Sequence, residues 1–405
     1  MNILYLGKFF PQTMLKTIKA DSKGKIGFSN HNFEMSILNG LCLQDGICLR
    51  CITLPGVFSY PQNNRNFFTK SESYDFRNTH ITSVGFCNLK GVKEKWSTVN
   101  CAKLIKDEIS KFQEGAINVI INTPDGRLLD ALEIVMRKCK RHITQTVIIP
   151  DIPSMVTSMD KQNFLKNFLL GRRDKKSMEM TSESDGLVLL TEAMMDFVCK
   201  PVKHIVMEGI VDAGTMDKRG VEAVADKKII LYTGTLRKIF GVQNLVKAFQ
   251  LIQDKDVELW ICGAGDSKEF IENAANTDSR IKFYGLVESS TALEMQHKAT
   301  ILVNPRTSEG EYTKYSFPSK TMEYLLAGKS TVVNRLPGIP EEYFNYAYTP
   351  KGESVEALAE CLANVLHLSE EERAVRANAG RQFILEKKNS KVQMERVIKM
   401  IRSYE

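Results

Sequence analysis

Short apolar runs rich in β-branched residues alternate with longer helical stretches along the whole chain. Runs of this kind, without polar and apolar alternation, are typical of strands buried on both faces, as in a parallel sheet covered by helices. In the first half, strands are predicted at 3–6, 47–54, 118–122, 146–149, 187–190 and 205–207, and helices at 33–43 and 128–142. This order predicts a doubly wound α/β unit.

The same pattern starts again near residue 228. Strands are predicted at 228–232, 258–262, 281–284, 300–303 and 330–333, with helices at 242–252 and 318–327. Because single cores stop growing at roughly 250–300 residues, two such series in 405 residues predict two domains. We therefore expect two Rossmann-like domains facing a cleft, with ligands at the carboxyl ends of the strands.

A polar, turn-rich stretch at 211–225 marks the expected boundary between the domains. We predict an N-terminal domain over 1–210 and a C-terminal domain over 211–389. The chain ends in a helix predicted at 392–401. A terminal helix of this kind can cross back onto the first domain, so residues 390–405 are assigned to that domain.

Composition excludes several classes of protein. The nine cysteines, an odd number spread along the chain, favour a reducing compartment over a disulfide framework. Cys48 and Cys51 form a CxxC inside a predicted strand, where residues three apart point to opposite faces and cannot hold a metal together. The net charge of +7 is mild, so no nucleic-acid partner is expected. No apolar run approaches the ~20 residues that span a bilayer, which favours a cytoplasmic protein.

The most informative segment joins a predicted buried strand to a helix and reads NPRTSEGEYTKYSFPSKTMEYLLAGKSTVV. Pro318 at the predicted start of the helix and Gly328 just past its end are strong boundary signals. Free amides at such a helix N-terminus, together with the helix dipole, favour binding of a pyrophosphate.

Three side chains near this helix N-terminus suit a nucleotide. Ser319 and Lys320 add a hydroxyl and a charge to the pyrophosphate site. Glu323, more than one turn further on, can accept hydrogen bonds from the vicinal hydroxyls of a ribose. The alternative is that Glu323 is an ordinary solvated helix residue.

The string YSFPSKTMEYLLAGKSTVV resembles the donor-site signature of the family-four retaining glycosyltransferases, which have the GT-B fold. The strings LYTGTLRKIFGVQNLVKAF, LWICGAGD, IKFYGLV and ATILVNPR precede it in the order that this family uses. The resemblance covers nearly the whole C-terminal half and is limited to an opening strand and a Gly-containing loop in the N-terminal domain. It is closest to the type that assembles bacterial polysaccharides.

The chain departs from the family pattern at the first of two glutamates. The family usually has two Glu separated by seven residues, of which Glu323 is the second, and the first would fall at Tyr315. Glu309 and Glu311 are nearby acids that could substitute if the loop is rearranged.

A second departure concerns two basic positions around the first turn of the donor domain. Where many members have an Arg and a Lys, this chain has Thr235 and Phe240. Arg237 and Lys238 lie in the same turn and could still reach a diphosphate. The alternative is a basic surface turn.

The resemblance implies a retaining transfer of a hexose or related sugar from a nucleoside-diphosphate sugar, with UDP as the family-level choice. The acceptor would be a glycan or a lipid-linked molecule in the assembly of a surface polysaccharide. The leaving diphosphate would itself take the acceptor proton, so the protein would mainly stabilise charge on that diphosphate. No metal or cofactor is expected, and the DxD string at 254–256 is interpreted as a solvated turn. A nucleotide-sugar epimerase or hydrolase, or a non-catalytic nucleotide-sugar-binding protein, remains an alternative on the same fold.

The residues assigned to the site share a place at predicted strand ends or in the loop and helix described above. Those assigned to donor binding are Gly234, Thr235, Gly263, Gly265, Arg306, Tyr315, Ser316, Phe317, Pro318, Ser319, Lys320 and Glu323. Those assigned to catalysis are Glu323, Arg237, Lys238 and Asp151. Those assigned to the acceptor side of the cleft are Gly7, Lys8, Gly27, Asp125 and Asp151, each of which has an ordinary loop or turn role as its alternative.

A stretch at 161–176 mixes Phe and Leu with Lys and Arg. A basic amphipathic helix can lie on an anionic membrane surface, which would suit a lipid-linked acceptor. We therefore expect a cytoplasmic protein with an optional peripheral contact on the inner face of the membrane. The alternative is a core-facing helix with a basic outer face.

Overall fold

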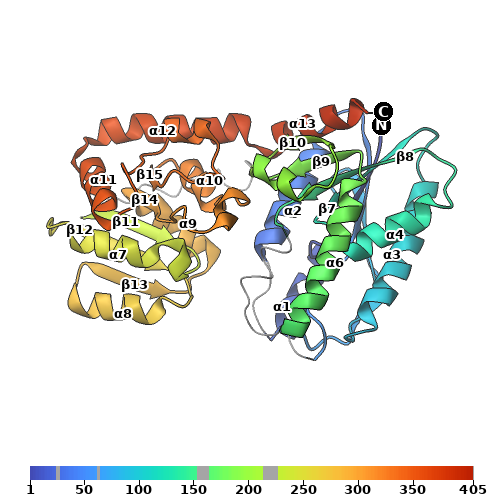
Figure 1. Ribbon diagram of the computed structural model, residues 1–405, viewed down its shortest axis with the longest axis horizontal. Coiled ribbons are helices and arrows are strands. Elements are labelled where there is room, and N and C mark those ends of the chain that lie inside the picture. The colour runs from blue at the N-terminus through green and yellow to red at the C-terminus, as the bar shows by residue number, and fades with distance from the viewer. Residues whose placement is uncertain (24–27, 62–63, 153–163, 213–226, 405) are drawn as a thin grey trace. The chain divides into compact units, whose positions relative to one another are not determined.

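The computed structural model describes residues 1–23, 28–61, 64–152, 164–212 and 227–404. The chain divides into two compact units, Met1–Asp212 with Asn389–Glu405, and Ala213–Lys388. Each unit consists of a sheet with helices on both faces (Figure 1). Among the described helices, none combines the length and the apolar character needed to cross a bilayer.

The first unit contains an eight-stranded sheet in the order β10-β9-β8-β7-β1-β2-β5-β4. Its strands are β1 Asn2–Gly7, β2 Cys48–Thr53, β4 Ser73–Phe76, β5 Thr79–Ser83, β7 Ile117–Asn122, β8 Ile143–Ile149, β9 Gly186–Leu189 and β10 Lys203–Val206. Every neighbouring pair is parallel except β4 and β5, which form an antiparallel edge. A separate antiparallel pair joins β3 Phe68–Thr69 to β6 Phe86–Cys87. The central strand β1 is buried along its whole length, as an apolar strand of a doubly wound sheet should be.

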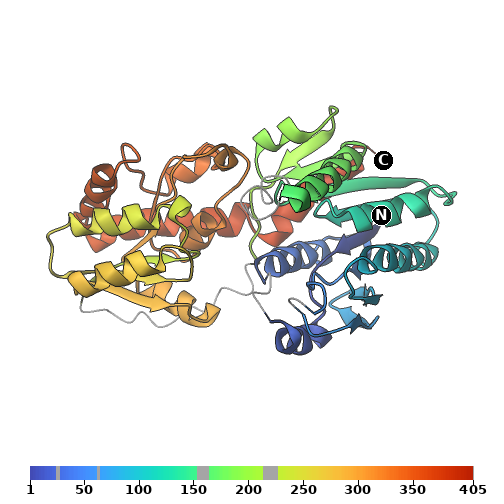
Figure 2. The ribbon, with the colours of Figure 1, turned by 60° about the horizontal axis from the view of Figure 1, so that its bottom comes forward.

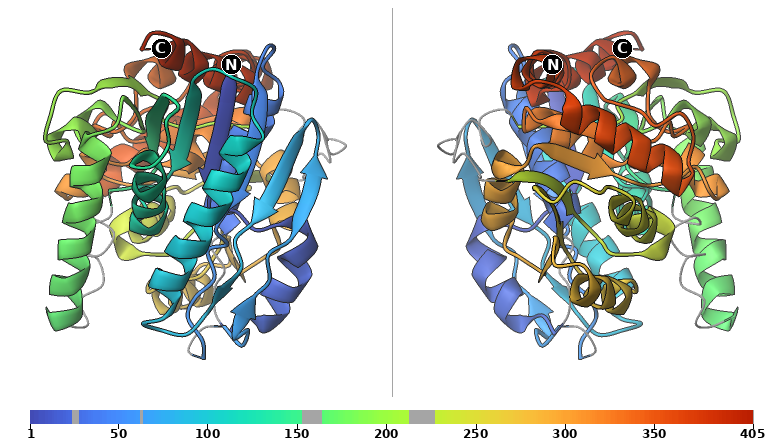
Figure 3. Two further views of the ribbon diagram at one scale, coloured as in Figure 1. Left: turned by 90° about the vertical axis from the view of Figure 1, so that its right-hand side faces the viewer. Right: turned by 90° about the vertical axis from the view of Figure 1, so that its left-hand side faces the viewer.

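Helices cover both faces of this sheet. They are α1 Leu15–Asp21, α2 Phe28–Cys42, α3 Lys93–Ser110, α4 Gly126–Met136, α6 Phe164–Ser182 and α13 Ser390–Arg402, with short 3₁₀ turns η1 Gln12–Met14 and η2 Glu192–Phe197. Apolar side chains of α2 and α13 share one core cluster with the sheet. On the other face α3 packs against α4, and α4 against α6 (Figures 1 and 3).

The second unit contains a five-stranded, wholly parallel sheet in the order β13-β12-β11-β14-β15. Its strands are β11 Lys228–Thr233, β12 Val257–Cys262, β13 Ile281–Gly285, β14 Ile301–Asn304 and β15 Ser330–Val333. Its helices are α7 Val242–Gln250, α8 Lys268–Thr277, α9 Ser289–Lys298, α10 Ser319–Leu326, α11 Val355–His367 and α12 Glu370–Lys387, with 3₁₀ turns η4 Lys238–Phe240, η5 Glu311–Lys314 and η6 Glu341–Asn345. One core cluster joins α7, α8 and α11 to the sheet and another joins α9 and α10 to it, which gives three layers (Figure 2).

The predicted α/β class with two strand–helix series is confirmed, and three details differ. The helix predicted at 128–142 ends at Met136, because Arg141 folds back to donate to the carbonyls of Ile109 and Gly115. The antiparallel edge β4–β5 was not predicted, because the alternating exposed and half-buried residues of β4 lack the apolar run of a parallel strand. Helix α3 was not predicted either.

The last helix returns to the first unit, as predicted. Helix α13 packs on α2, and Ser390 donates its backbone N–H to the carbonyl of Val211 at 2.8 Å. Gly40 makes this close packing possible, because a Cβ there would overlap the carbonyl oxygen of Ser390 and approach Met394 Cγ to 2.6 Å. The chain end is therefore a structural part of the first unit.

Replacing Gly40 with Ala should destabilise the first unit by about 1–3 kcal/mol, since the added methyl group overpacks the α2–α13 contact. Gly171→Ala in α6 is the matched control, because a Cβ there meets no atom within 4 Å. Denaturant unfolding followed by circular dichroism compares the two variants with the wild type. Equal midpoints for Gly40→Ala and the wild type would contradict the packing of α13 on α2.

Candidate functional site

The N-terminus of α10 lies at the carboxyl edge of the second sheet, because α10 connects two parallel strands, β14 and β15. The helix begins at Ser319, and Pro318 is its N-cap rather than its first residue as predicted. The reason is the extended ψ of 96° at Pro318, whose carbonyl accepts the amide of Thr321 at 2.8 Å. No side chain caps this terminus, so its first amides are available to a ligand.

Glu323 is held by two neighbours at this edge. Lys320 donates to both carboxylate oxygens at 2.8 Å, and the Gln296 amide donates to Oε1 at 2.6 Å. The Glu323 and Lys320 side chains are 29% and 35% exposed, so a ligand can reach the pair. Gln296, on α9, is fully buried, and its own Oε1 has no hydrogen-bond partner within the described residues. The two side chains that we assigned to separate parts of a nucleotide therefore form an ion pair with each other.

A buried tyrosine fixes α10 against the end of β11. The hydroxyl of Tyr324 accepts the backbone N–H of Thr233 at 2.9 Å and donates to its carbonyl at 3.1 Å. Gln296 also donates to Thr233 Oγ1 at 3.3 Å. The sequence analysis assigned no role to Gln296 or Tyr324. The only signal in the sequence was that both residues lie in helical stretches among apolar residues.

Glycines let the loops after β11 and β12 approach closely. A Cβ on Gly263, whose φ is +144°, would overlap the carbonyl oxygen of Gly234. A Cβ on Gly265 would overlap the carbonyl oxygen of Leu236. Gly241, with φ of +75°, lies against the carbonyl of Pro305 in the same way. The predicted donor-site glycines Gly234, Gly263 and Gly265, together with Gly241, thus bring three strand ends into backbone contact.

Arg306 follows β14 and is only 8% exposed. Its guanidinium stacks over the ring of Tyr312, with 4.5 Å between Cζ and the ring centroid, and donates to Ser316 Oγ at 2.7 Å. Its Nε has no hydrogen-bond partner, and no ion pair to Arg306 occurs within the described residues. Burial lowers the pKa of Arg306 below its ordinary value. The Tyr312 ring and the Ser316 hydroxyl are neutral, so they do not supply the opposite charge that a buried cation needs.

The ring of Phe240 lies beside two guanidinium groups. Arg237 Cζ is 5.9 Å from the ring centroid and Arg306 Cζ is 5.5 Å from it. Lys238 is exposed, and its backbone N–H donates to Asp266 at 2.8 Å. Thr235 is exposed too. Phe240, at the position where many members of the resembled family carry a Lys, therefore lies beside two arginines, one from its own turn and one from the loop after β14.

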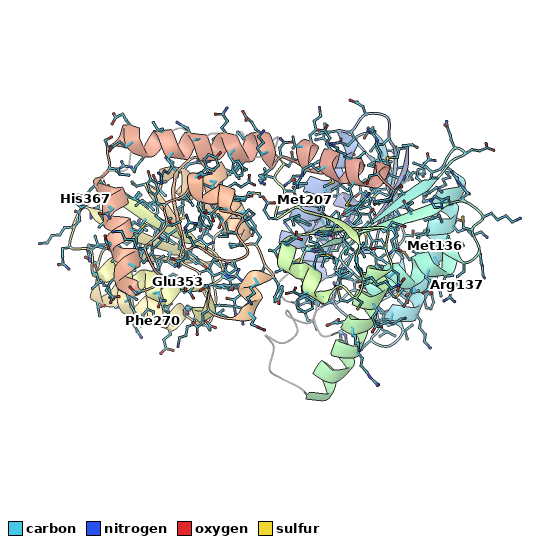
Figure 4. All side chains as sticks on the ribbon, turned by 45° about the horizontal axis from the view of Figure 1, so that its top comes forward. Met136, Arg137, Met207, Phe270, Glu353 and His367 are labelled. Carbon is cyan, nitrogen blue, oxygen red and sulfur yellow. The ribbon has the colours of Figure 1, made fainter. Side chains whose placement is uncertain are left out.

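The loop before α10 is anchored on both sides. Phe317 is buried against Tyr343, with ring centroids 5.2 Å apart, so it packs in the core. Tyr315, in the place of the usual first Glu, is partly buried. Ser308 donates its backbone N–H and hydroxyl to Glu353 at 2.8 and 3.0 Å (Figure 4 labels Glu353).

The acceptor-side residues of the first unit form a charged cluster at the carboxyl ends of β1 and β7. Asp125 caps α4 and accepts from the Arg127 backbone N–H at 3.0 Å. Its carboxylate also pairs with Arg127 at 2.7 Å and with Lys8 at 3.0 Å. Burial by itself would raise the pKa of Asp125, but the Lys8 and Arg127 cations hold it well below the usual range. Lys8 and Asp125, both predicted, are thus in direct contact.

Glu34, on α2, is the group that the sequence analysis missed. It is fully buried and accepts the backbone N–H of Lys8 at 2.7 Å and the Asn30 amide at 3.0 Å. A Cβ on Gly7 would overlap its carboxylate, so this glycine makes room for it. Burial raises the pKa of Glu34 to about 7. A lone Glu in a helix gave no signal of its burial.

The other predicted acceptor-side positions can be placed only in part. Asp151 is exposed just after β8. Gly27 lies outside the described residues, and so do positions 161–163 of the basic stretch and most of the predicted boundary at 211–225. In the described part of that stretch, Lys176 pairs with Asp130 at 2.9 Å and Lys175 faces Glu179 at 4.0 Å.

The described residues contain no group of three or more His, Cys, Asp and Glu side chains that could hold a metal ion. The DxD string at 254–256 lies in a turn, where Asp254 accepts the Asp256 amide at 2.9 Å. Cys48 is exposed and Cys51 is buried, so the CxxC sulfurs lie on opposite faces of β2.

The raised pKa of Glu34 predicts a pH-dependent stability. Between the ordinary pKa of about 4.5 and the folded value of about 7, the folded state holds a proton that the unfolded state has lost. The free energy of unfolding should therefore fall as the pH rises through this window, by up to about 1.4 kcal/mol per pH unit.

Glu34→Gln cannot release this proton, so its unfolding free energy should fall less between pH 5 and 7 than that of the wild type. Denaturant titrations at several pH values measure both proteins, and the difference between them removes the contribution of all other groups. Identical pH profiles would show that Glu34 is ionised throughout.

Comparison with known proteins finds a family to which most of the second unit is similar. Residues 227–367 match the family described as glycosyl transferases group 1. An uncharacterised glycosyltransferase of Methanocaldococcus jannaschii is 25% identical over 128 residues, which are 31% of this chain and 31% of that protein. The match thus spans about a third of the length of this curated relative.

Solved structures match the entire fold. Sucrose-phosphate synthase from Thermosynechococcus elongatus superposes with a TM-score of 0.61 at 13% identity, covering 100% of both chains. The UDP-forming α,α-trehalose-phosphate synthase from Burkholderia xenovorans, in complex with glucose-6-phosphate, gives 0.61 at 11% identity over 99% of both chains. These similarities confirm the predicted GT-B fold. The part of the chain that carries Arg306 and Glu323 is therefore similar to the group 1 glycosyl transferases, within a chain that has the GT-B fold.

Proposed function

We propose that this protein is a retaining glycosyltransferase that moves a hexose or related sugar from a nucleoside-diphosphate sugar to a glycan or lipid-linked acceptor. The main support is Arg306, a buried guanidinium with no ion pair within the described residues, which lies in the same loop as the uncapped N-terminus of α10. A buried charge without a partner is costly, and an anionic ligand would remove that cost.

The diphosphate of the donor would bind to Arg306, Arg237 and the first amides of α10. Both guanidinium groups lie within 6 Å of the Phe240 ring centroid, so the two cations share one aromatic neighbour. Arginine suits this role because its planar fork can donate two parallel hydrogen bonds to phosphate oxygens. In this proposal the two arginines replace the basic pair that relatives carry at the positions of Thr235 and Phe240.

The ribose of the donor would bind to Glu323. The carboxylate is already oriented by Gln296, whose buried amide donates to both Thr233 and Glu323. Ribose hydroxyls would take the place of the Lys320 ammonium at the carboxylate. Lys320 would then be free to turn toward the diphosphate, which lies nearer the start of the helix.

The chemistry follows from this arrangement of charge. Negative charge develops on the diphosphate as the sugar–oxygen bond breaks, and donors fixed in advance stabilise it without reorganisation. The acceptor hydroxyl attacks from the same face and passes its proton to the leaving phosphate, so no separate base is required. Lys238 and Asp151 remain candidates for contacts to the reacting groups. Lys8, Asp125, Gly7 and Gly27 remain candidates for the acceptor side.

The finer parts of the proposal follow from the family resemblance. UDP is the proposed nucleotide, and assembly of a capsule, exopolysaccharide or other surface polysaccharide is the proposed setting. A cytoplasmic location with a peripheral contact on the inner face of the membrane suits a lipid-linked acceptor. The stretch 161–176 was predicted to make this contact.

Replacing Glu323 with Gln should weaken binding of a nucleoside diphosphate by at least about tenfold, or 1.4 kcal/mol, because two charge-assisted hydrogen bonds to the ribose lose strength. Arg306→Met should weaken binding of the nucleoside diphosphate but not of the nucleoside alone. Calorimetric titration measures both ligands, and circular dichroism checks folding. Glu294→Gln on α9 is the matched control, because Glu294 is exposed.

Product formation with a panel of nucleotide sugars separates transfer from the alternatives. An epimerase changes the sugar while it stays on the nucleotide, and a binding protein leaves the donor intact. If Glu323→Gln binds the donor as tightly as the wild type, the ribose has been assigned to the wrong side chain.

A further inference from the structure

Six large apolar side chains are exposed together on the first unit, around β3 and the start of α3. They are Phe58, Phe67, Phe68, Val92, Trp96 and Val99, between 41% and 64% exposed. We refer to these six residues as the aromatic patch. Helix α3, which contributes three of them with its N-cap, lies on the face of the first unit turned to the viewer in Figure 3, left.

The patch is continuous rather than a set of scattered residues. The rings of Phe67 and Phe68 are 5.0 Å apart, and those of Phe68 and Trp96 are 6.3 Å apart. Val92 and Val99 lie four and three residues from Trp96, on the same side of the helix. A contiguous exposed apolar surface of this kind marks a site that meets another apolar surface.

The loops that carry the patch are held by one buried amide. Asn88 donates its Nδ2 to the carbonyls of Phe58 and Asn66, at 2.8 and 3.0 Å. Asn88 itself is fully buried. The apolar side chains therefore protrude from a fixed base.

Exposed cations lie close to the patch residues in the sequence. Arg65, Lys70, Lys90 and Lys95 each lie within two residues of a patch member and are exposed. No side-chain hydrogen bond or ion pair in the described part of the chain uses any of these four cations. Within two residues of a patch member, the sequence has one acid, Glu94. Among the residues next to the patch in the sequence, cations therefore outnumber acids, which favours an anionic partner.

We propose that the aromatic patch docks the first unit on an anionic lipid bilayer. Aromatic rings are favourable at the level of the lipid headgroups, and lysines and arginines around them are attracted to anionic lipids. The Phe67–Phe68 and Phe68–Trp96 rings meet at 63° and 79°, so they form a wedge rather than a flat platform for a sugar ring. A second copy of the chain is disfavoured, because a two-fold contact would bring these cations of the two copies together.

The patch lies beside a cavity lined by Asp125, and the role of docking in transfer rests on the proposed function. Lys95 and Val99 also line a cavity of about 410 Å³ together with the acceptor-side residues Asp125 and Arg127. Docking through the patch would hold this cavity near the bilayer, where a lipid-linked acceptor resides. The docking itself needs no donor, so it can be tested apart from transfer.

Tryptophan fluorescence tests the contact directly. The chain has two tryptophans, and Trp260→Phe leaves Trp96 as the only one. Vesicles of phosphatidylcholine with phosphatidylglycerol should shift the Trp96 emission to the blue, and brominated lipid should quench it. Vesicles of phosphatidylcholine alone should have little effect, and added salt should reverse much of the binding.

Two independent variants test the two components of the surface. Phe67→Ser with Phe68→Ser, and separately Lys90→Glu with Lys95→Glu, should each weaken binding to anionic vesicles by at least about tenfold. The matched control carries Lys255→Glu and Lys298→Glu, two exposed positions of the second unit, and should bind as the wild type does. A separate variant, Arg172→Glu with Lys175→Glu and Lys176→Glu on α6, tests the stretch 161–176 as the competing membrane contact and should keep most of the binding if the patch makes the contact. Circular dichroism confirms folding, and unchanged nucleoside diphosphate binding separates this test from the proposed function.

Three outcomes would overturn the proposal. The first is an absence of vesicle binding by the folded wild type. The second is loss of binding in the α6 variant while both patch variants bind normally. The third is a Trp96 response to soluble oligosaccharides but not to vesicles, which would assign the patch to a glycan.

Discussion

The second unit depends on a backbone contact that only glycines allow. The ends of β11, β12 and β14 meet where Gly263 lies against Gly234 and Gly241 against Pro305, with no room for a Cβ at Gly263 or Gly241. The Tyr324 hydroxyl then ties α10 to both backbone groups of Thr233. Together these contacts fix the helix N-terminus, Arg306 and Glu323 on one rigid edge of the sheet, and a site on rigid elements can hold its donors in advance.

A buried carboxylate of the first unit has cationic partners, whereas a buried cation of the second unit has no anionic partner among the described residues. In the first unit, Asp125 is compensated by Lys8 and Arg127, and its pKa is held low, whereas burial raises the pKa of Glu34 to about 7. In the second unit, Arg306 is buried over aromatic rings without an ion pair in the described residues. A charge that the fold leaves uncompensated is best explained by a ligand of opposite sign, and a diphosphate has that sign.

Sequence predicted the parts of this structure that depend on local pattern. The alternation of buried strands and helices and the loop before α10 follow from periodicity, Gly and Pro. The return of the last helix was expected from the two-domain architecture and not from such a pattern. The Arg306–Phe240–Arg237 arrangement could not be predicted, because tertiary packing brings Arg306 to Phe240, which lies 66 positions earlier in the chain. Glu34 and Gln296 were missed for the same reason, since a polar residue in a helix shows its burial only once its neighbours are known. The ion pair between Lys320 and Glu323 could have been predicted, because their i, i+3 spacing places them side by side on a helix.

The central claim is that the edge formed by Arg306, the start of α10 and Glu323 binds a nucleoside diphosphate. Calorimetric titration of the wild-type protein with UDP, uridine and inorganic pyrophosphate tests it most directly. We predict that UDP binds more tightly than either fragment, because the ribose and the diphosphate contact different groups on one rigid edge. If folded protein binds neither UDP nor any other nucleoside diphosphate, the assignment of this edge as a donor site is contradicted.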